Sequence, residues 1–111
     1  MKIPPDADIP MEKLTRYFLV PRMRDDKSRF LSQAGFDLTN PDVLLHAIRD
    51  HAAAYEAFPD GDNQYGEFYR VEGGLLGPNG ITLQVVTVWI RWHIDGSTHL
   101  VTLKPLRGQK P

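Results

Sequence analysis

The segment from residue 85 to residue 104 constrains the fold most, because it has the pattern of two apolar strands joined by an Asp95-Gly96 turn. This dipeptide between runs of alternating side chains is typical of a β-hairpin with a two-residue turn. Such a turn fixes the pairing of the strands, and residues that face each other across a hairpin share one face of the sheet. We therefore expect Arg91 to lie opposite Leu100.

The predicted register gives the hairpin one apolar face and one polar face. We expect the apolar face to form part of the core, with these residues pointing inward: Val86, Val88, Ile90, Trp92, Ile94, Val101 and Leu103. The other face carries basic groups and hydroxyls, namely Thr87, Arg91, His93, Thr98, Thr102 and Lys104. Such a polar surface is unusual in a hairpin so rich in large apolar residues.

Helix signals mark three segments before the hairpin, and we expect helices at residues 10–19, 26–33 and 41–57. The third has the clearest start, because Asn40-Pro41 combines a preferred N-cap residue with a proline at the first helical position. Residues 59–63 are rich in Asp, Gly and Asn and are expected to form a loop.

Two further strands are expected at residues 65–76 and 81–94, with a tight turn between them. Pairing their facing ends places Leu76 opposite Ile81, although a bulge at Gly73-Gly74 would shift this register by one residue. The pattern predicts an α+β fold, in which two or three N-terminal helices pack on one face of a three- to four-stranded twisted antiparallel meander. The polar face of the sheet is then expected to stay open.

A chain of 111 residues is expected to form one domain. Residues 1–10 carry three prolines and should form an irregular arm, residues 11–106 the α+β domain, and residues 107–111 a disordered tail. Cysteine is absent, which excludes disulfides and thiolate metal sites. The formal net charge of −1 disfavours bulk attraction to nucleic acid but allows a local basic surface. Because no segment has the pattern of a membrane span or a secretory signal, we expect a soluble cytoplasmic protein.

Short motifs distributed over nearly the whole chain resemble a known family. In chain order they are Lys13-Leu-Thr-Arg-Tyr-Phe-Leu, Asp26-Lys27-Ser-Arg-Phe30, Gln64-Tyr-Gly66, Gly77-Pro-Asn-Gly80, Val86-Val-Thr-Val-Trp-Ile90 and Leu100-Val-Thr102. That order is similar to an uncharacterised bacterial family of small standalone proteins. Related domains form the C-terminal tips of contact-dependent and polymorphic toxins and are grouped with the barnase–EndoU–colicin–RelE endoribonucleases. The resemblance implies helices that lead into a curved antiparallel sheet bearing the site.

The resemblance also singles out individual positions. Lys27 matches a lysine of the family's second helix, and Thr102 matches a threonine of its last strand. His99 stands where the family often has arginine. Arg22 and Arg24 stand where the family tends to have a histidine, which puts a helix-borne general base in doubt.

Metal-free RNA cleavage needs an acceptor for the 2′-hydroxyl proton, cations beside the phosphorane and a proton donor for the leaving 5′-oxygen. Histidine, arginine, lysine and hydroxyl side chains can supply these roles, and an aromatic ring can stack a base. We predict catalytic roles for His93, Arg91, Lys27 and Thr102. Substrate binding is predicted for Arg70, Lys104, Thr98, Arg24 and Trp89. No metal or cofactor is expected, because no zinc spacing, phosphate loop or dinucleotide fingerprint is found.

The first hypothesis is therefore a toxin-like, metal-independent endoribonuclease that acts on RNA, with transfer RNA as one candidate, and is neutralised by a small cognate antitoxin or immunity protein. The alternative is a non-enzymatic interaction module that uses a Trp89, Phe68 and Arg91 surface, with a homodimer as one form. An inactive relative of the family is a third reading. His46 and His51 are five residues apart on the third helix and are interpreted as solvated, whereas His99 is expected to be packed and hydrogen-bonded.

Overall fold

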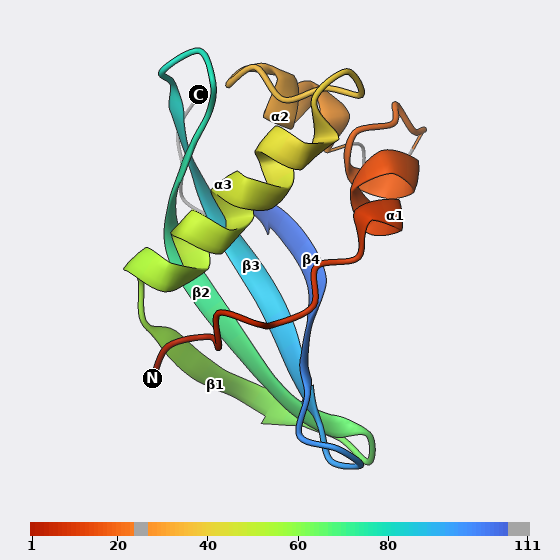
Figure 1. Ribbon diagram of the computed structural model, residues 1–111, viewed down its shortest axis with the longest axis vertical. Coiled ribbons are helices and arrows are strands. Elements are labelled where there is room, and N and C mark those ends of the chain that lie inside the picture. The colour runs from red at the N-terminus through yellow and green to blue at the C-terminus, as the bar shows by residue number, and fades with distance from the viewer. Residues whose placement is uncertain (24–26, 107–111) are drawn as a thin grey trace.

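The computed structural model describes residues 1–23 and 27–106 of the chain. Its four strands form one antiparallel sheet whose spatial order follows the sequence: β1 (Ala57–Asp62), β2 (Gly66–Leu76), β3 (Thr82–Trp92) and β4 (Thr98–Pro105). Helices precede the sheet in the chain and lie against one of its faces (Figure 1). The predicted α+β meander is confirmed.

The helical segments are α1 (Met11–Lys13), the π-helical turn η1 (Leu14–Phe18) that continues it, α2 (Ser28–Ser32) and α3 (Pro41–Ala54). Helix α3 begins at the predicted proline but ends three residues earlier than predicted, because Tyr55 is already extended. None of the helices in the described ranges is long and apolar enough to cross a bilayer.

The core lies between the sheet and a layer made of α3 and the N-terminal arm. Helix α3 crosses the sheet diagonally, and the arm runs beside it on the same face (Figure 1). Leu44, Ile48 and Ala52 are buried at four-residue spacing, which is the spacing that aligns side chains on one face of a helix. The guanidinium of Arg49 fixes the arm, because its Nη1 donates to the carbonyls of Pro5 at 3.1 Å and Ala7 at 2.9 Å.

The helices cover the opposite face of β3 from the one predicted. Val85, Thr87 and Trp89 are buried with at most 1% of each residue exposed, so they form the core face of the strand. Val88 and Ile90, which were predicted to be in the core, point to the face that the helices leave uncovered. Since neighbours along a strand alternate between faces, a change of one residue moves every side chain to the other face.

The register between β2 and β3 differs by one residue from the simple pairing of the strand ends. Leu76 pairs with Thr82 rather than with Ile81, and Tyr69 pairs with Trp89. The shift has the size that was considered for a bulge near Gly73, but the pairing runs through Gly73 and Gly74 without a bulge. It places Tyr69 on the helix-covered face beside Trp89.

The hairpin between β3 and β4 has a four-residue loop, His93–Gly96, and the prediction of a two-residue turn is wrong. Trp92 N donates to Ser97 O at 2.9 Å, and Gly96 closes the loop with a φ of 72°. The Asp95 carboxylate also accepts hydrogen bonds from the backbone and hydroxyl of Ser97, so the side chain helps to form the turn. Arg91 therefore pairs with Thr98 instead of Leu100.

A further irregularity lies within β4, where the register shifts between Val88 and Trp89 of β3. Val88 pairs with Thr102 and Trp89 with Leu100, so Val101 is the extra residue of a β-bulge. Strand β1 was predicted as a loop, and its proline explains why. Pro59 cannot donate a ladder hydrogen bond, but it is tolerated here because β1 is an edge strand.

Candidate basic pocket

A pocket of about 260 Å³ lies where η1 and the segment before α2 meet β4. Its lining consists of Lys13, Tyr17, Phe18, Arg22, Lys27, Val101 and Thr102. We call this set the basic pocket, because three of its side chains are cationic and none is a carboxylate. Lys27 and Thr102, both predicted as catalytic residues, therefore line one pocket together.

The geometry of η1 positions the helical side of the basic pocket. Leu19 N donates to Leu14 O at 3.0 Å, which is the five-residue spacing of a π-helical turn. Leu14 and Phe18 point into the core and are almost fully buried, so they anchor the turn. Tyr17, the neighbour of Phe18, is then directed outward with 52% of the residue exposed.

Aromatic rings in the basic pocket hold two of the cations. The guanidinium carbon of Arg22 lies 5.3 Å from the centre of the Tyr17 ring, and Lys27 Nζ lies 5.9 Å from that of Phe18. Both distances fall within the range of cation–π attraction. These contacts orient the positive groups without neutralising their charge.

The positive charge of the basic pocket is not compensated by neighbours that the structure describes. Within residues 1–23 and 27–106, no carboxylate lies within ion-pair distance of Lys13, Arg22 or Lys27. Asp25 and Asp26, next to Lys27 in sequence, are outside the described residues, as is the predicted substrate-binding residue Arg24. A cluster of cations that lacks an ion-pair partner among the described residues attracts anions.

Arg91 and His93 do not join Lys27 and Thr102, so the predicted convergence of all four is wrong. Arg91 is three residues further along β3 than Val88, the partner of Thr102, or about 10 Å at the usual rise per residue. His93 belongs to the loop beyond the end of β3, where its Nε2 donates to Asn63 O at 3.2 Å. These two residues lie at the end of the sheet away from the helices.

Two predicted binding residues are buried. Trp89 is 1% exposed in the core and is not available to stack a base, and Thr98 is 7% exposed beneath the N-terminal arm. Burial of Trp89 is possible because its indole Nε1 donates a hydrogen bond to Thr87 Oγ1 at 2.9 Å. A buried tryptophan with its N–H satisfied is stable in a core.

The other two predicted binding residues also lie outside the basic pocket. Arg70 is held between two carboxylates, with its Nη1 3.4 Å from Asp60 Oδ1 and its Nε 3.2 Å from Glu72 Oε2. Lys104 is exposed near the end of β4 and pairs with Val86. The polar surface predicted for the open face is thus replaced by a mixed face, on which Arg70, Thr102 and Lys104 lie beside the aliphatic residues of β3. The basic pocket is formed where β4 meets the helices.

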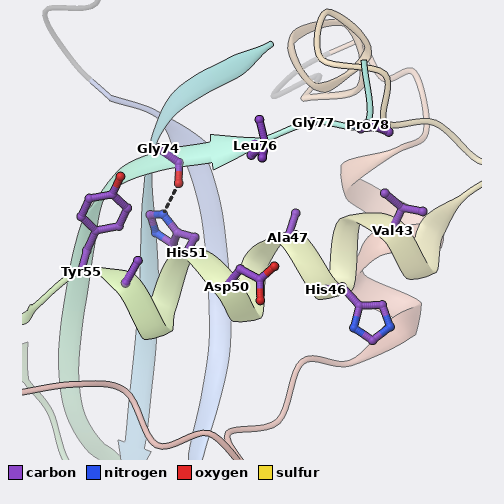
Figure 2. A pocket seen from close by; sticks show the side chains of 11 residues that line it. Val43, His46, Ala47, Asp50, His51, Tyr55, Gly74, Leu76, Gly77 and Pro78 are labelled. Carbon is purple, nitrogen blue, oxygen red and sulfur yellow. Dashed lines mark hydrogen bonds between the residues drawn. The ribbon is translucent and has the colours of Figure 1, made fainter. Parts of the chain in front are cut away.

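His51 is buried at 2% exposure, contrary to the expectation that it is solvated. Figure 2 shows it pointing from α3 toward Gly74, beside Tyr55, whereas His46 points away from the strand. Its Nδ1 lies 3.1 Å from Gly74 O and therefore donates, while Nε2 lies 3.0 Å from Thr87 Oγ1 and accepts from that hydroxyl. Burial lowers the pKa of His51, so the neutral ring is favoured. We regard this chain of hydrogen bonds as structural.

Lys13 and Tyr17 belong to the basic pocket but were not predicted as site residues. A sequence signal for them exists, because residues four apart on a helix share one face. Arg22, which stands where the family tends to have a histidine, lines the pocket itself. His99 is hydrogen-bonded as expected, and its contacts lie at the other end of the sheet.

The fold is shared with a protein of known structure. One chain of the "Contact-dependent growth inhibition toxin - immunity protein complex from Klebsiella pneumoniae 342" is similar over 88% of this chain and 98% of its own length, with a TM-score of 0.66 and 18% identity. At this identity the likeness concerns the fold. No curated protein matches the sequence. Residues 5–107 match a sequence family, and the chain therefore belongs to the family described as "Domain of unknown function (DUF6883)".

Proposed function

We propose that this chain is a toxin-like endoribonuclease that binds the phosphodiester backbone of RNA in the basic pocket. The observation that carries the proposal is the gathering of Lys13, Arg22 and Lys27 around one cavity with the Thr102 hydroxyl. Arginine and lysine are the side chains best suited to phosphate, and a hydroxyl can donate to a non-bridging oxygen.

The reaction fits what the basic pocket offers. In metal-free cleavage the 2′-oxygen attacks phosphorus as its proton passes to a solvent water, and the bond to the 5′-oxygen breaks as that oxygen takes a proton from water. Charge accumulates on the phosphorane, where Lys27 and Arg22 would stabilise it. The exposed ring of Tyr17 is available to stack a base. Because histidine is absent from the lining residues, we assign the pocket phosphate binding and charge stabilisation rather than proton transfer.

The toxin part of the proposal includes a small partner protein. A chain of a toxin–immunity complex has the same fold, which supports a small cognate partner protein. In this proposal that partner is an antitoxin or immunity protein. Transfer RNA is one candidate substrate. We place this activity in the cytoplasm, where RNA is accessible.

The test is incubation of purified protein with total RNA and with transfer RNA in the presence of EDTA. We expect cleavage that leaves 2′,3′-cyclic phosphate ends, and we expect Lys27→Ala to slow it about 100-fold or more. Arg29→Ala is the matched control, because Arg29 is an exposed cation only two residues away that does not line the basic pocket. Equal activity of the two variants, or an inactive parent beside an active control nuclease, would count against the proposal.

A non-enzymatic interaction module is the second candidate, and the uncovered face of the sheet favours it. The Trp89, Phe68 and Arg91 surface does not exist as predicted, because Trp89 is in the core. Phe68 instead faces Ile90 across the uncovered side of the sheet, and Phe58 on β1 is 53% exposed. Light scattering that shows a tight dimer, together with absent RNA cleavage, would support this candidate.

A further inference from the structure

The loop between β1 and β2 and the loop between β3 and β4 lie together at the end of the sheet farthest from the helices (Figure 1). A second cleft is lined by residues of these loops and of the end of β3. Its volume is about 510 Å³, and its lining consists of Gln64, Tyr65, Trp92, His93 and Ile94. We call it the tip cleft. It shares no lining residue with the basic pocket.

Large apolar side chains are exposed around the tip cleft. Ile94 is 88% exposed, Tyr65 66% and Trp92 40%. Loops at hairpin ends are normally built from small and polar residues. Ile94 stands between a histidine and the Asp95-Gly96 pair, and its exposure means that it contributes little to the core. Exposed aliphatic and aromatic groups that line one cleft are typical of a binding site for another molecule.

Hydrogen bonds tie the two loops of the tip cleft together. His93 N donates to Tyr65 O at 2.9 Å, and its ring donates to Asn63 O. The Asn63 side chain in turn accepts from the backbone of Tyr65 at 2.8 Å and of Gly66 at 3.1 Å. The cleft is therefore formed before any ligand arrives, which lowers the entropy cost of binding.

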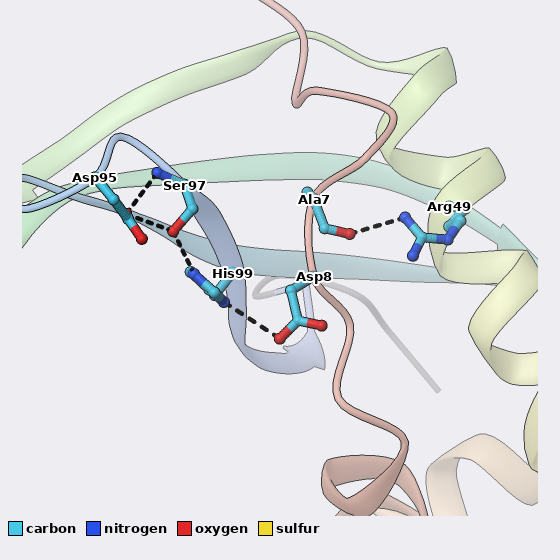
Figure 3. A network of polar contacts seen from close by, with 6 residues as sticks. All are labelled: Ala7, Asp8, Arg49, Asp95, Ser97 and His99. Atoms are coloured by element: carbon cyan, nitrogen blue, oxygen red, sulfur yellow. Dashed lines mark hydrogen bonds and ion pairs between the residues drawn. The ribbon is translucent and has the colours of Figure 1, made fainter.

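One wall of the tip cleft is further fixed by an aromatic stack. The Trp92 and His99 rings lie 4.2 Å apart at an angle of 26°. Figure 3 shows His99 held between two groups: its Nδ1 is 3.2 Å from Asp8 Oδ2, and its Nε2 is 2.7 Å from Ser97 Oγ. The N-terminal arm therefore supports the ring on which Trp92 rests.

The charges around the tip cleft decide which kind of molecule fits it. Residues 60–68 and 90–98, which form this end of the sheet, contain four carboxylates and one guanidinium: Asp60, Asp62, Glu67, Asp95 and Arg91. Even with Asp60 paired to Arg70, the balance is negative. A nucleic acid would be repelled here, whereas a positively charged segment would be attracted.

We propose that the tip cleft docks a protein segment in which an aromatic or aliphatic side chain is flanked by lysine or arginine residues. The apolar side chain would enter between Tyr65, Trp92 and Ile94. The flanking cations would face the carboxylates of the neighbouring loops and strand ends, none of which lines the cleft itself. This docking requires no RNA cleavage, so either proposal can fail while the other stands.

The experiment is an NMR titration of isotope-labelled full-length protein with the peptide Ac-KKFKK-NH2. We expect saturable shifts of the backbone amides of Tyr65, Trp92 and Ile94, and binding at least about tenfold weaker for Ac-EEFEE-NH2. The substitution Ile94→Ser should weaken binding of the basic peptide about tenfold or more. Ile81→Ser is the matched control, because Ile81 is an exposed isoleucine at the opposite end of β3 and is expected to leave binding unchanged.

Three results would overturn the proposal. The first is equal affinity for the basic and acidic peptides, or no shift localised at the tip. Another is a short single-stranded RNA that shifts the same amides at lower concentration than the basic peptide. The third is concentration-dependent self-association that Ile94→Ser abolishes, since the occupant would then be a second copy of this chain.

Discussion

The basic pocket and the tip cleft differ in charge and in how they are built. The basic pocket lies beside the helices and carries three cations, two of which rest on aromatic rings. The tip cleft lies beyond the helices and combines exposed apolar groups with neighbouring loops and strand ends in which carboxylates outnumber cations. A chain with a formal net charge of −1 can thus present a local positive surface at one end. Net charge alone is therefore a poor guide to whether this fold binds RNA.

The largest difference between the core and the tip is expected from two tryptophans of β3 that are three residues apart. Replacing Trp89 by alanine should lower the free energy of unfolding by about 3–5 kcal/mol, because a fully buried ring is lost. Trp92→Ala should cost only about 1 kcal/mol, the value of an exposed aromatic pair. Urea unfolding of both variants checks this. Similar losses would mean that the faces of β3 are assigned wrongly.

The rate of RNA cleavage should next distinguish a substitution in the basic pocket from one near the tip. Lys27→Ala is expected to reduce RNA cleavage about 100-fold, equivalent to roughly 2.7 kcal/mol of transition-state stabilisation. Arg91→Ala should have little effect, because Arg91 lies about 10 Å further along β3 than the partner of Thr102 and does not line the basic pocket. The measurement is the initial rate of transfer RNA cleavage at fixed salt. If Arg91→Ala is as damaging as Lys27→Ala, the site predicted from the sequence is the better one.

A third comparison concerns the buried polar chain between α3 and β3. Thr87→Val removes the partner of both His51 Nε2 and Trp89 Nε1, and each buried polar group left unpaired costs about 1–3 kcal/mol. Unfolding in urea should show this loss. Thr82→Val, at an exposed position of the same strand, is expected to change stability by no more than about 0.5 kcal/mol. A neutral Thr87→Val would contradict the assigned hydrogen bonds.

A dependence of stability on pH should follow from His51. Burial lowers its pKa in the folded state below the ordinary 6.5, so the unfolded chain takes up a proton first as the pH falls. The contribution of His51 to the free energy of unfolding is therefore fully present above about pH 6.5. It declines as the pH falls toward the folded-state pKa, with a slope of at most about 1.4 kcal/mol per pH unit. Urea unfolding of the parent and His51→Gln between pH 7.5 and 5.5 measures it. An equal decline in both proteins would exclude His51 as the cause.

Much of the fold could be predicted from residue pattern, and the faces of the sheet could not. The Asp95-Gly96 pair and the Asn40-Pro41 pair located a hairpin and a helix start correctly. The aliphatic run of Val86, Val88 and Ile90 was the natural choice for the core. The structure instead buries the side of β3 that carries Thr87. The Thr87 hydroxyl is hydrogen-bonded there to His51, which lies 36 residues earlier in the sequence. Pairing of this kind is tertiary and leaves no local signal.

The candidate site shows the same division between local and tertiary information. Lys27 and Thr102 were singled out by resemblance, and they line one pocket. Arg91 and His93 were predicted as site residues from a register that assumed a two-residue turn. The loop has four residues instead, and β4 contains a bulge. A turn motif indicates that a hairpin exists but does not fix the number of residues in its loop. That number decides which side chains face each other across the two strands.

The central claim is that RNA binds at the basic pocket and avoids the tip. It is tested most directly by an NMR titration with a 2′-O-methylated RNA oligonucleotide, which lacks the attacking hydroxyl and is not cleaved. The account predicts shifts at Tyr17, Lys27 and Thr102, with Tyr65 and Ile94 unchanged, and weaker binding as salt rises. Shifts confined to Tyr65 and Ile94, or none at the pocket at low salt, would contradict it.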